Sequence, residues 1–194
     1  MNLKRMNRAA TLFAILCVLP ATALATGQEP DVLIYKGKTY DLFANPLEDF
    51  YPDENKRPVF FRQKGYVRST GNWRGYVATW TIENNILYLV KIDAWTCNQN
   101  LKHCRKVELR NLFGSRYRDG KVKADWFSTD LRMPDGKMLR YVHMGYGSIY
   151  EREITLTVDS GKVVKESMVD NTNRTLPSAL ELERQELEKM KPKP

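Results

Sequence analysis

The stretch that decides the fold runs from Tyr76 to Trp95 and reads YVATWTIENNILYLVKIDAW. In residues 76–82 the apolar side chains alternate with threonines and valine, and a period of two is typical of a half-buried strand. Asn84 and Asn85 follow, and asparagine tolerates the positive φ angles of a tight turn. Residues 86–95 are apolar on both sides for much of their length, as in a central strand. The pattern predicts a β-hairpin at the centre of a sheet.

Similar signals extend outward from this hairpin in both directions. Each consists of two apolar runs separated by residues that favour a turn. The predicted turns are Lys36-Gly37 between residues 32–35 and 38–43, Pro134-Asp135-Gly136-Lys137 between 121–133 and 138–144, and Asp159-Ser160-Gly161 between 151–158 and 162–169. A further strand is expected at 107–113, and a switch of the apolar face within 121–133 predicts a bulge. Residues 45–58 contain three prolines and are expected to form an extended connection.

These runs predict a mainly β domain, an antiparallel meander that forms a curled sheet, a β-roll or an incomplete barrel. A two-sheet sandwich is the alternative. One C-terminal α-helix is expected, because Ser178 and Glu181 have the spacing of a capping box. The apolar stripe of this helix, Leu180, Leu187 and Met190, is narrow, so the helix is expected to be peripheral or to contact a partner.

The start of the chain has the composition of a secretory signal peptide. Lys4, Arg5 and Arg8 precede an apolar run at residues 9–19, and Ala23 and Ala25 fit the cleavage site. We therefore expect residues 1–25 to be the signal peptide, 26–176 the β domain, and 177–194 the helix and tail. The expected location is periplasmic or secreted, with no stable membrane span because the apolar run is short. Lipidation at Cys17 is the weaker alternative.

The charge pattern excludes few partners but favours some over others. The chain has 31 Lys and Arg against 23 Asp and Glu. Its basic residues occur in short runs that are scattered along the sequence. Such a pattern is typical of a solvated surface, and export disfavours nucleic acid as a partner. No cofactor motif and no metal motif is found in the sequence, so none is expected.

Two cysteines remain after the expected leader. Cys97 and Cys104 lie between two predicted strands, and an even pair in an oxidising compartment indicates a disulfide. Zinc bound by these residues with His103 is the alternative, although the spacing is irregular. A redox-active pair is disfavoured because there is no Cys-x-x-Cys at a helix start.

The densest polar and aromatic segment is 139–151, where Gly145 and Gly147 flank Tyr146. Tyrosine, tryptophan and arginine beside a glycine-framed loop are typical of a binding surface, for protein or for carbohydrate. The candidate binding residues are Trp73, Arg74, Arg132, Tyr146 and Tyr150. The catalytic alternative is His143 acting as a general base with Asp130 or Glu151, although no nucleophile motif accompanies them.

Two sets of residues in this sequence resemble known protein families. Gly71-Asn72-Trp73 before a strand resembles the Gly-x-Trp of lipocalin barrels, which implies that Trp73 plugs a closed end under Arg74 or Arg152 and that the barrel carries a small apolar ligand. Residues 69–80, 87–89, 124–128, 141–148 and 150–151 together resemble a group of bacterial proteins of unknown function. That resemblance implies a bacterial origin and one continuous domain over residues 32–170, and no activity.

The expected function is therefore that of an exported, non-catalytic binding protein. Its partner is expected to be a protein, such as a cell-envelope enzyme or toxin that it restrains, or an envelope glycan. A hydrolase and a lipocalin-like carrier remain the alternatives. An exposed patch that holds Tyr146 and Trp73 would favour the binding protein, and an enclosed apolar cavity would favour the carrier.

Overall fold

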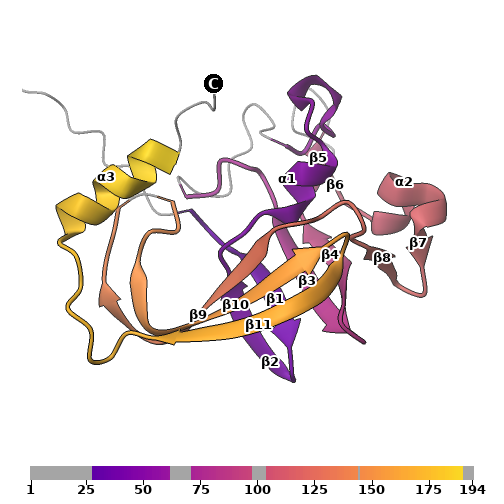
Figure 1. Ribbon diagram of the computed structural model, residues 1–194. Helices are drawn as coiled ribbons and strands as arrows, with labels where there is room; N and C mark the ends of the chain where they lie inside the picture. Colours follow the sequence, from indigo (N-terminus) through magenta and orange to yellow (C-terminus); the bar gives the residue numbers. More distant parts are fainter. Residues whose placement is uncertain (1–27, 62–70, 98–103, 144, 190–194) are drawn as a thin grey trace, which may run out of the picture.

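The computed structural model describes residues 28–61, 71–97, 104–143 and 145–189, and in them the chain is mainly β (Figure 1). One mixed sheet of nine strands has the order β2-β1-β3-β4-β11-β10-β9, with β8 paired to β4 and β7 paired to β8. The strands of this sheet are β1 (Asp31–Tyr35), β2 (Lys38–Leu42), β3 (Val77–Glu83), β4 (Ile86–Asp93), β7 (Tyr117–Arg118), β8 (Lys121–Lys123), β9 (Asp130–Arg140), β10 (Ile149–Asp159) and β11 (Lys162–Asp170). A separate ladder joins β5 (Trp95–Cys97) to β6 (Cys104–Lys106).

Three of the predicted hairpins are confirmed, each with two turn residues at positive φ. The φ angles are 48° and 76° at Lys36 and Gly37, 50° and 61° at Asn84 and Asn85, and 47° and 78° at Ser160 and Gly161. Two positive φ angles match the right-handed twist of the flanking strands, which is why glycine and asparagine occupy such turns. The sequence signal was reliable here because the constraint is local.

The turn predicted at residues 134–137 is wrong. Strand β9 continues through Pro134 and Gly136, and it pairs with β10 on both sides of them. The register shifts between Tyr150 and Arg152, opposite this segment. Gly136 has φ +87°, and a side chain there would collide with the carboxylate of Glu151. The Pro-Asp-Gly segment is therefore an irregularity within a long strand, and the predicted returning strand is the end of β9.

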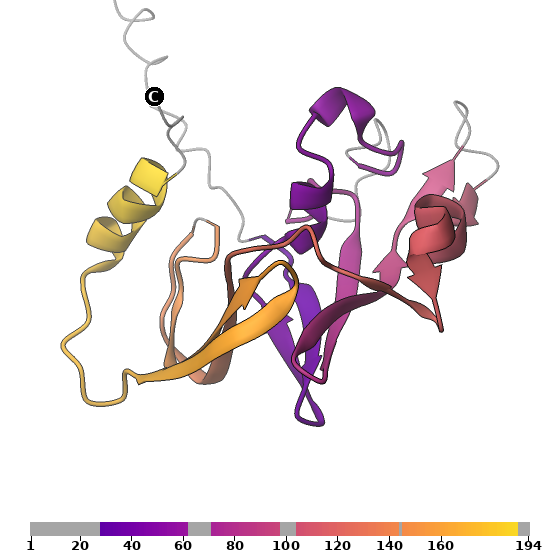
Figure 2. The ribbon, with the colours of Figure 1, turned by 45° about the vertical axis from the view of Figure 1, so that its right-hand side comes forward.

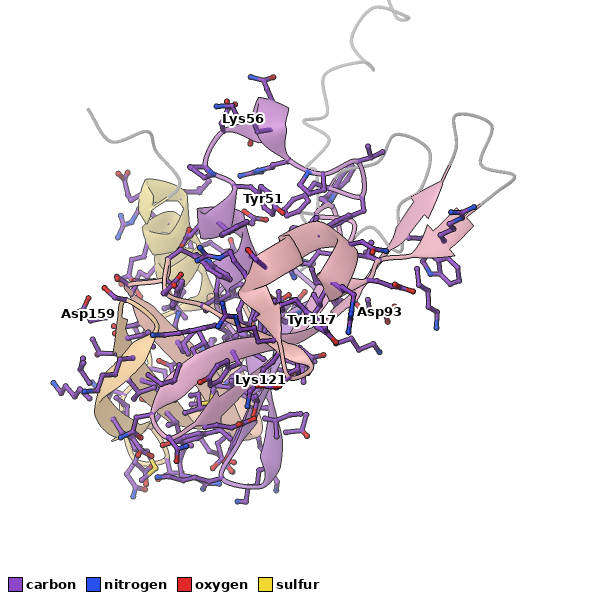
Figure 3. The ribbon with its side chains drawn as sticks, turned by 90° about the vertical axis from the view of Figure 1, so that its right-hand side faces the viewer. Tyr51, Lys56, Asp93, Tyr117, Lys121 and Asp159 are labelled. Carbon is purple, nitrogen blue, oxygen red and sulfur yellow. The ribbon has the colours of Figure 1, made fainter. Side chains whose placement is uncertain are left out.

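The strand predicted at 107–113 is also wrong, because helix α2 (Leu109–Phe113) occupies most of it. Leu109 and Phe113 are four residues apart, lie on one helix face and are both buried. Gly114, at φ +52°, ends the helix. Figure 3 shows α2 close to Tyr117 at the start of β7, whose ring lies 5.4 Å from the Arg110 guanidinium.

Two further predictions, both for segments that connect strands, are wrong. The 45–58 connection is not extended: helix α1 (Pro46–Phe50) and the short 3₁₀ helix η1 (Glu54–Lys56) lie within it. Proline is favoured in the first turn of a helix, where its missing N–H costs nothing. In 121–133 the apolar face changes because β8 ends and β9 begins, with Phe127 buried between them. This break replaces the predicted bulge.

The sheet curls but does not close into a barrel, which confirms the predicted mainly β domain with an open, curled sheet; in the described residues the only other sheet is the two-stranded β5–β6 ladder. Strand β1 pairs with β3 in parallel, which makes the sheet mixed rather than purely antiparallel. The two end strands are β2 and β9. They meet at one main-chain hydrogen bond, in which Phe43 N–H donates to Arg132 O at 2.8 Å.

The predicted C-terminal helix is confirmed as α3 (Ala179–Lys189). Its capping box is formed, since Ser178 N–H and Oγ donate to Glu181 Oε2 at 2.8 Å, and Glu181 N–H donates to Ser178 Oγ at 3.3 Å. Leu180 and Leu187 are exposed, whereas Leu182 is buried. Figures 1 and 2 show α3 beside the segment that joins β9 to β10, at the same end of the molecule as α1. No helix in the described part of the chain is long and apolar enough to cross a membrane.

Candidate functional site

A small aromatic cluster forms where the end strands β2 and β9 meet. The ring of Phe43, which follows β2, stacks on Tyr146 with centroids 4.8 Å apart and an interplanar angle of 9°. Tyr150, in β10, meets Phe43 edge-on at 5.9 Å. We call Phe43, Tyr146 and Tyr150 the tyrosine cluster. Two of the predicted binding residues therefore lie together, on a phenylalanine that the sequence analysis did not select.

Tyr146 is linked by hydrogen bonds through one asparagine to Arg74, another of the predicted binding residues. Asn45 Oδ1 accepts hydrogen bonds from Tyr146 Oη at 2.9 Å and from Arg74 Nη1 at 2.5 Å. Burial raises the pKa of Tyr146 to about 12. The tyrosine therefore stays neutral across the physiological pH range and can serve as a donor to Asn45.

Arg74 is buried, with 5% of its surface exposed, and pairs with the fully buried Asp31. Asp31 Oδ1 accepts from Arg74 Nη1 and from Ala78 N–H, and Oδ2 accepts from Trp80 Nε1, all at 3.0 Å. Burial raises the pKa of Asp31, while the Arg74 charge and these N–H groups oppose that rise. Burial acts to lower the pKa of Arg74, but Asp31 together with Tyr76, Tyr146 and Glu48 opposes it, and the pKa is raised. Arg74 is thus a buried residue that positions its neighbours in the site, and it does not offer a surface for a partner to contact.

The turn before β3 presents Trp73 to solvent. Asn72 is buried: its Nδ2 donates to Glu29 Oε2 at 2.7 Å and to Tyr76 O at 3.1 Å, and its Oδ1 accepts from Gly75 N–H at 2.9 Å. With Asn72 and Arg74 both directed inward, the intervening Trp73 is 60% exposed. Trp73 is therefore not the buried plug that the lipocalin resemblance implied, and the sheet is not the closed barrel that resemblance requires.

Arg132 makes a bidentate ion pair across the β9–β10 ladder. Its Nε donates to Glu153 Oε1 at 3.0 Å and its Nη2 to Glu153 Oε2 at 2.6 Å. Its carbonyl accepts the hydrogen bond from Phe43 that joins the two end strands. Arg132 therefore lies at the seam between β2 and β9, although its guanidinium is occupied by Glu153.

Next to the Phe43–Arg132 hydrogen bond, residues of β2 and β9 border an open groove of about 470 Å³. Tyr150 lines it and also belongs to the tyrosine cluster, so groove and cluster form one candidate site. Burial and the nearby Asp41 carboxylate raise the pKa of Tyr150. We call this opening the seam groove; its lining residues are Lys38, Thr39, Tyr40, Asp41, Pro134, Asp135, Gly136 and Tyr150.

One edge of β2 directs main-chain groups toward the seam groove and β9, and in the described part of the chain this edge is not paired in a ladder. The two-residue turn makes Tyr35 and Lys38 a hydrogen-bonded pair, and such pairs alternate along an antiparallel ladder. Lys38, Tyr40 and Leu42 therefore bond to β1, whereas Thr39 and Asp41 direct N–H and C=O groups outward. Phe43 continues this alternation, and its N–H does point across the seam to Arg132.

The residues of the catalytic alternative lie in different places. Asp130 begins β9 and accepts a hydrogen bond from Thr157 Oγ1 at 2.8 Å. His143 lies beyond the other end of β9, with its Nδ1 3.3 Å from Tyr141 Oη. Glu151, in β10, accepts from Lys137 N–H at 3.0 Å. Each group is engaged in a structural contact within its own ladder or loop.

The cysteine pair is described only by its main chain. Cys97 and Cys104 are directly opposite in the β5–β6 ladder. Opposite Cα atoms in an antiparallel ladder are about 4.5–5.5 Å apart, a separation that a disulfide can span. Residues 98–103, and so His103 of the zinc alternative, lie outside the described residues, as do residues 1–27 with the expected leader. In the described part, no three His, Cys, Asp or Glu side chains form a group that could hold a metal ion.

Sequence reasoning missed the residues that organise the site. Asp31, Asn45 and Asn72 are ordinary polar residues at strand or turn boundaries, and nothing local predicts the burial of Asp31 and Asn72 or the contacts of Asn45. Comparison of the chain with protein-family models, with curated proteins and with solved structures gives no match. The assignment of function therefore rests on the geometry of the site.

Proposed function

We propose that this chain is an exported, non-catalytic binding protein that recognises another protein of the cell envelope through the seam groove and the tyrosine cluster. The observation that carries the proposal is the open groove, bounded by two sheet edges and backed by Tyr150 on Phe43. Rigid aromatic side chains beside a groove are typical of binding sites. Restraint of an envelope enzyme or toxin is the form of binding that we favour.

The exposed Trp73 supports the same proposal. It has 60% of its surface in contact with solvent, and it is held there by the buried Asn72 and Arg74 on either side. Because its neighbours hold the main chain of this turn, Trp73 can bind a partner without ordering the turn. The Asp31–Arg74–Asn45–Tyr146 chain of contacts links the Trp73 turn to the tyrosine cluster.

The experiment uses the mature chain with a photocrosslinking amino acid in place of Lys38, which lines the seam groove. The control places the same group at Lys56, an exposed residue of η1 that is labelled in Figure 3. We expect one envelope polypeptide to be crosslinked from position 38 and not from 56. Tyr150→Ala should lower the yield at 38 at least fivefold. Equal yields at both positions, or capture of glycan alone, would count against the proposal.

A disulfide between Cys97 and Cys104 belongs to the same proposal, because an exported chain matures in an oxidising compartment. The opposite register of the two residues supports it. Intact mass spectrometry without reductant should give a chain about 2 Da lighter than the reduced chain. Reduction should also lower the midpoint of unfolding, by an amount that corresponds to about 2.5 kcal/mol for so short a loop. Two free thiols in the exported protein would refute the bond.

A further inference from the structure

Strand β11 has an outer edge that is paired only at its beginning. Lys162 lies opposite Ile86 of β4, and Val163 N–H donates to Asn85 O at 2.8 Å. Beyond Val163, β10 is the one strand that runs alongside β11 in the described part of the chain. In Figure 1, β11 accordingly lies outermost of the three strands β9, β10 and β11. Residues 164–170 therefore form a free edge.

The main-chain groups on this edge can be assigned by alternation along the strand. Asn171 N–H donates to Glu151 O at 2.8 Å, so residue 171 directs its groups toward β10. In an antiparallel ladder the direction alternates from residue to residue. Glu166, Met168 and Asp170 therefore direct N–H and C=O away from β10. Among the described residues, no main-chain group bonds to them on that side.

The side chains of this edge are more apolar than solvent exposure requires. Val164, Met168 and Val169 are 58%, 63% and 40% exposed. The strand contains no proline, and its one irregularity lies near its start, opposite Thr157 and Val158. Long edges with free donors and acceptors pair with other strands unless proline, bulges or covering segments prevent it. None of these devices protects residues 165–170 in the described structure.

We propose that two copies of this chain associate through β11, with the two strands antiparallel and a two-fold axis at Ser167. Glu166 of each copy forms a hydrogen-bonded pair with Met168 of the other, which uses the outward groups of both residues. Lys165 lies opposite Val169 of the other copy. Each copy offers one such edge, so the association closes at a dimer. The inference does not depend on the proposed function, because β11 contributes no residue to the seam groove.

The charges of β11 favour a second copy in this register as the occupant of the edge. With the axis at Lys165 or Glu166, a charge would lie directly opposite its own counterpart, and with the axis at Met168, Glu166 would face Asp170. An axis beyond Met168 would pair fewer residues, because β11 ends at Asp170. The axis at Ser167 avoids these conflicts, and it places the aliphatic stem of each charged residue over an apolar side chain of the other copy.

The contacts that Glu166 already makes are compatible with this pairing. Lys36 Nζ and Tyr35 Oη, from the end of β1 and its turn, lie 2.8 and 3.0 Å from the Glu166 carboxylate. They bond to the side chain and leave the main chain of Glu166 available. Lys36 also balances the charge of Glu166, so the two copies of this acid that lie near the axis repel each other little.

The first test measures the oligomeric state and a crosslink at the axis. The mature chain should sediment with twice the mass of one chain. Cα atoms directly opposite in an antiparallel ladder are about 4.5–5.5 Å apart, so Ser167→Cys should form a disulfide with its counterpart under mild oxidation. Thr155→Cys, opposite Ser167 in β10, is one strand further from the axis and should not. Oxidised wild type gives the background from Cys97 and Cys104.

The second test reverses charges to probe the register. Val169→Lys sets an ammonium group opposite Lys165 of the other copy, twice per dimer, and should raise the dimer dissociation constant about tenfold. Adding Lys165→Glu turns this repulsion into attraction and should return the constant to within about threefold of wild type. Both side chains are exposed, so the circular dichroism of both variants should match the wild type.

The third test removes one main-chain donor from the edge. Met168→Pro lacks the outward N–H and should give a folded monomer, because proline is tolerated at an edge position whose N–H does not serve the neighbouring strand. Met168→Leu keeps the N–H and should remain a dimer. A wild-type chain that is monomeric at its highest soluble concentration overturns the inference. A dimer whose dissociation constant is unchanged by Val169→Lys overturns it as well, since the interface then lies elsewhere.

Discussion

At the scale of single residues, Asp31 decides the local structure around the site. Its two carboxylate oxygens accept from Arg74, Ala78 and Trp80, and the acid is fully buried. A buried carboxylate with three N–H donors, one of them from an arginine, is satisfied, but either member of the ion pair alone would be an uncompensated buried charge. The same arginine reaches Asn45 and through it Tyr146. The position of a surface aromatic thus depends on an acid that no solvent reaches.

Asp31→Asn is expected to lower the free energy of unfolding by about 3–5 kcal/mol, because it leaves the Arg74 charge buried without its partner. Urea denaturation followed by tryptophan fluorescence measures this loss. The matched control is Glu83→Gln, which breaks the exposed pair with Lys121 and should leave the unfolding midpoint nearly unchanged. A loss below about 1 kcal/mol in Asp31→Asn would show that the buried pair is not needed.

Tyr146 makes the folded protein sensitive to alkali. Its pKa of about 12 in the folded chain exceeds the ordinary value near 10, so the phenol retains its proton after unfolding would have released it. The resulting stability is complete below pH 10 and is lost as the pH rises toward 12. Wild type should lose stability faster than Tyr146→Phe over this interval. Denaturation midpoints at pH 9, 10 and 11 check it, and parallel slopes in the two proteins would contradict it.

At the scale of elements, the hairpin turns carry the local determinants of the sheet. Gly37 and Gly161 are both the second residue of a two-residue turn, with φ +76° and +78°. Their surroundings differ, since nothing lies within 4 Å of a Cβ built on Gly37, whereas one on Gly161 would lie 2.6 Å from Ala124 O. Gly161 also bonds through its main chain to Leu87 and Phe127. The β10–β11 turn is therefore docked on the core, whereas the β1–β2 turn contacts β11 through the exposed Lys36–Glu166 ion pair.

Gly161→Ala is expected to destabilise the chain more than Gly37→Ala does. Both variants pay the cost of a positive φ, about 1–2 kcal/mol, but only the first forces main-chain atoms apart. We expect Gly161→Ala to cost at least about 1 kcal/mol more than its control, because the Ala124 carbonyl cannot rotate away as a side chain would. Thermal unfolding of the two variants side by side measures the difference. Equal midpoints would mean that the β10–β11 turn moves freely.

At the scale of the whole molecule, an interrupted seam distinguishes this fold from a closed barrel. The sheet curls far enough for Phe43 N–H to donate to Arg132 O, and Pro134, two residues further along β9, has no N–H to donate in turn. A closed barrel would have no edges, whereas in the described residues β2 and β9 remain the end strands of this sheet. The site lies at that edge, so the incomplete closure of the barrel creates the proposed binding groove.

Export is the prediction that concerns the whole chain. We expect the mature protein to begin at Thr26, after cleavage behind Ala25, because the leader has a basic start, an apolar core and small residues at the cleavage site. N-terminal sequencing of the protein from a periplasmic fraction checks this. Lys4→Glu with Arg5→Glu should raise the uncut fraction. Full-length chain free in the cytosol of wild-type cells would overturn the proposed location and partner class together.

Local sequence by itself determined the three hairpin turns at Lys36-Gly37, Asn84-Asn85 and Ser160-Gly161, and the capping box of Ser178 and Glu181. These features depend on φ preferences and on hydrogen bonds within a few residues, which the sequence displays directly. It also indicated two tyrosines and a tryptophan of the candidate site, because aromatic residues beside glycines are visible without a fold.

Only the tertiary structure decided the rest. Pro134-Asp135-Gly136 has every local mark of a turn, yet the ladder with β10 keeps it extended. Residues 107–113 suit a strand by composition, yet burial of Leu109 and Phe113 on one face makes most of them a helix. The burial of Asp31 and Arg74 and the alignment of β2 with β9 arise between residues distant in the chain. Such contacts depend on which surfaces the folded sheet brings together, and no window of sequence contains that information.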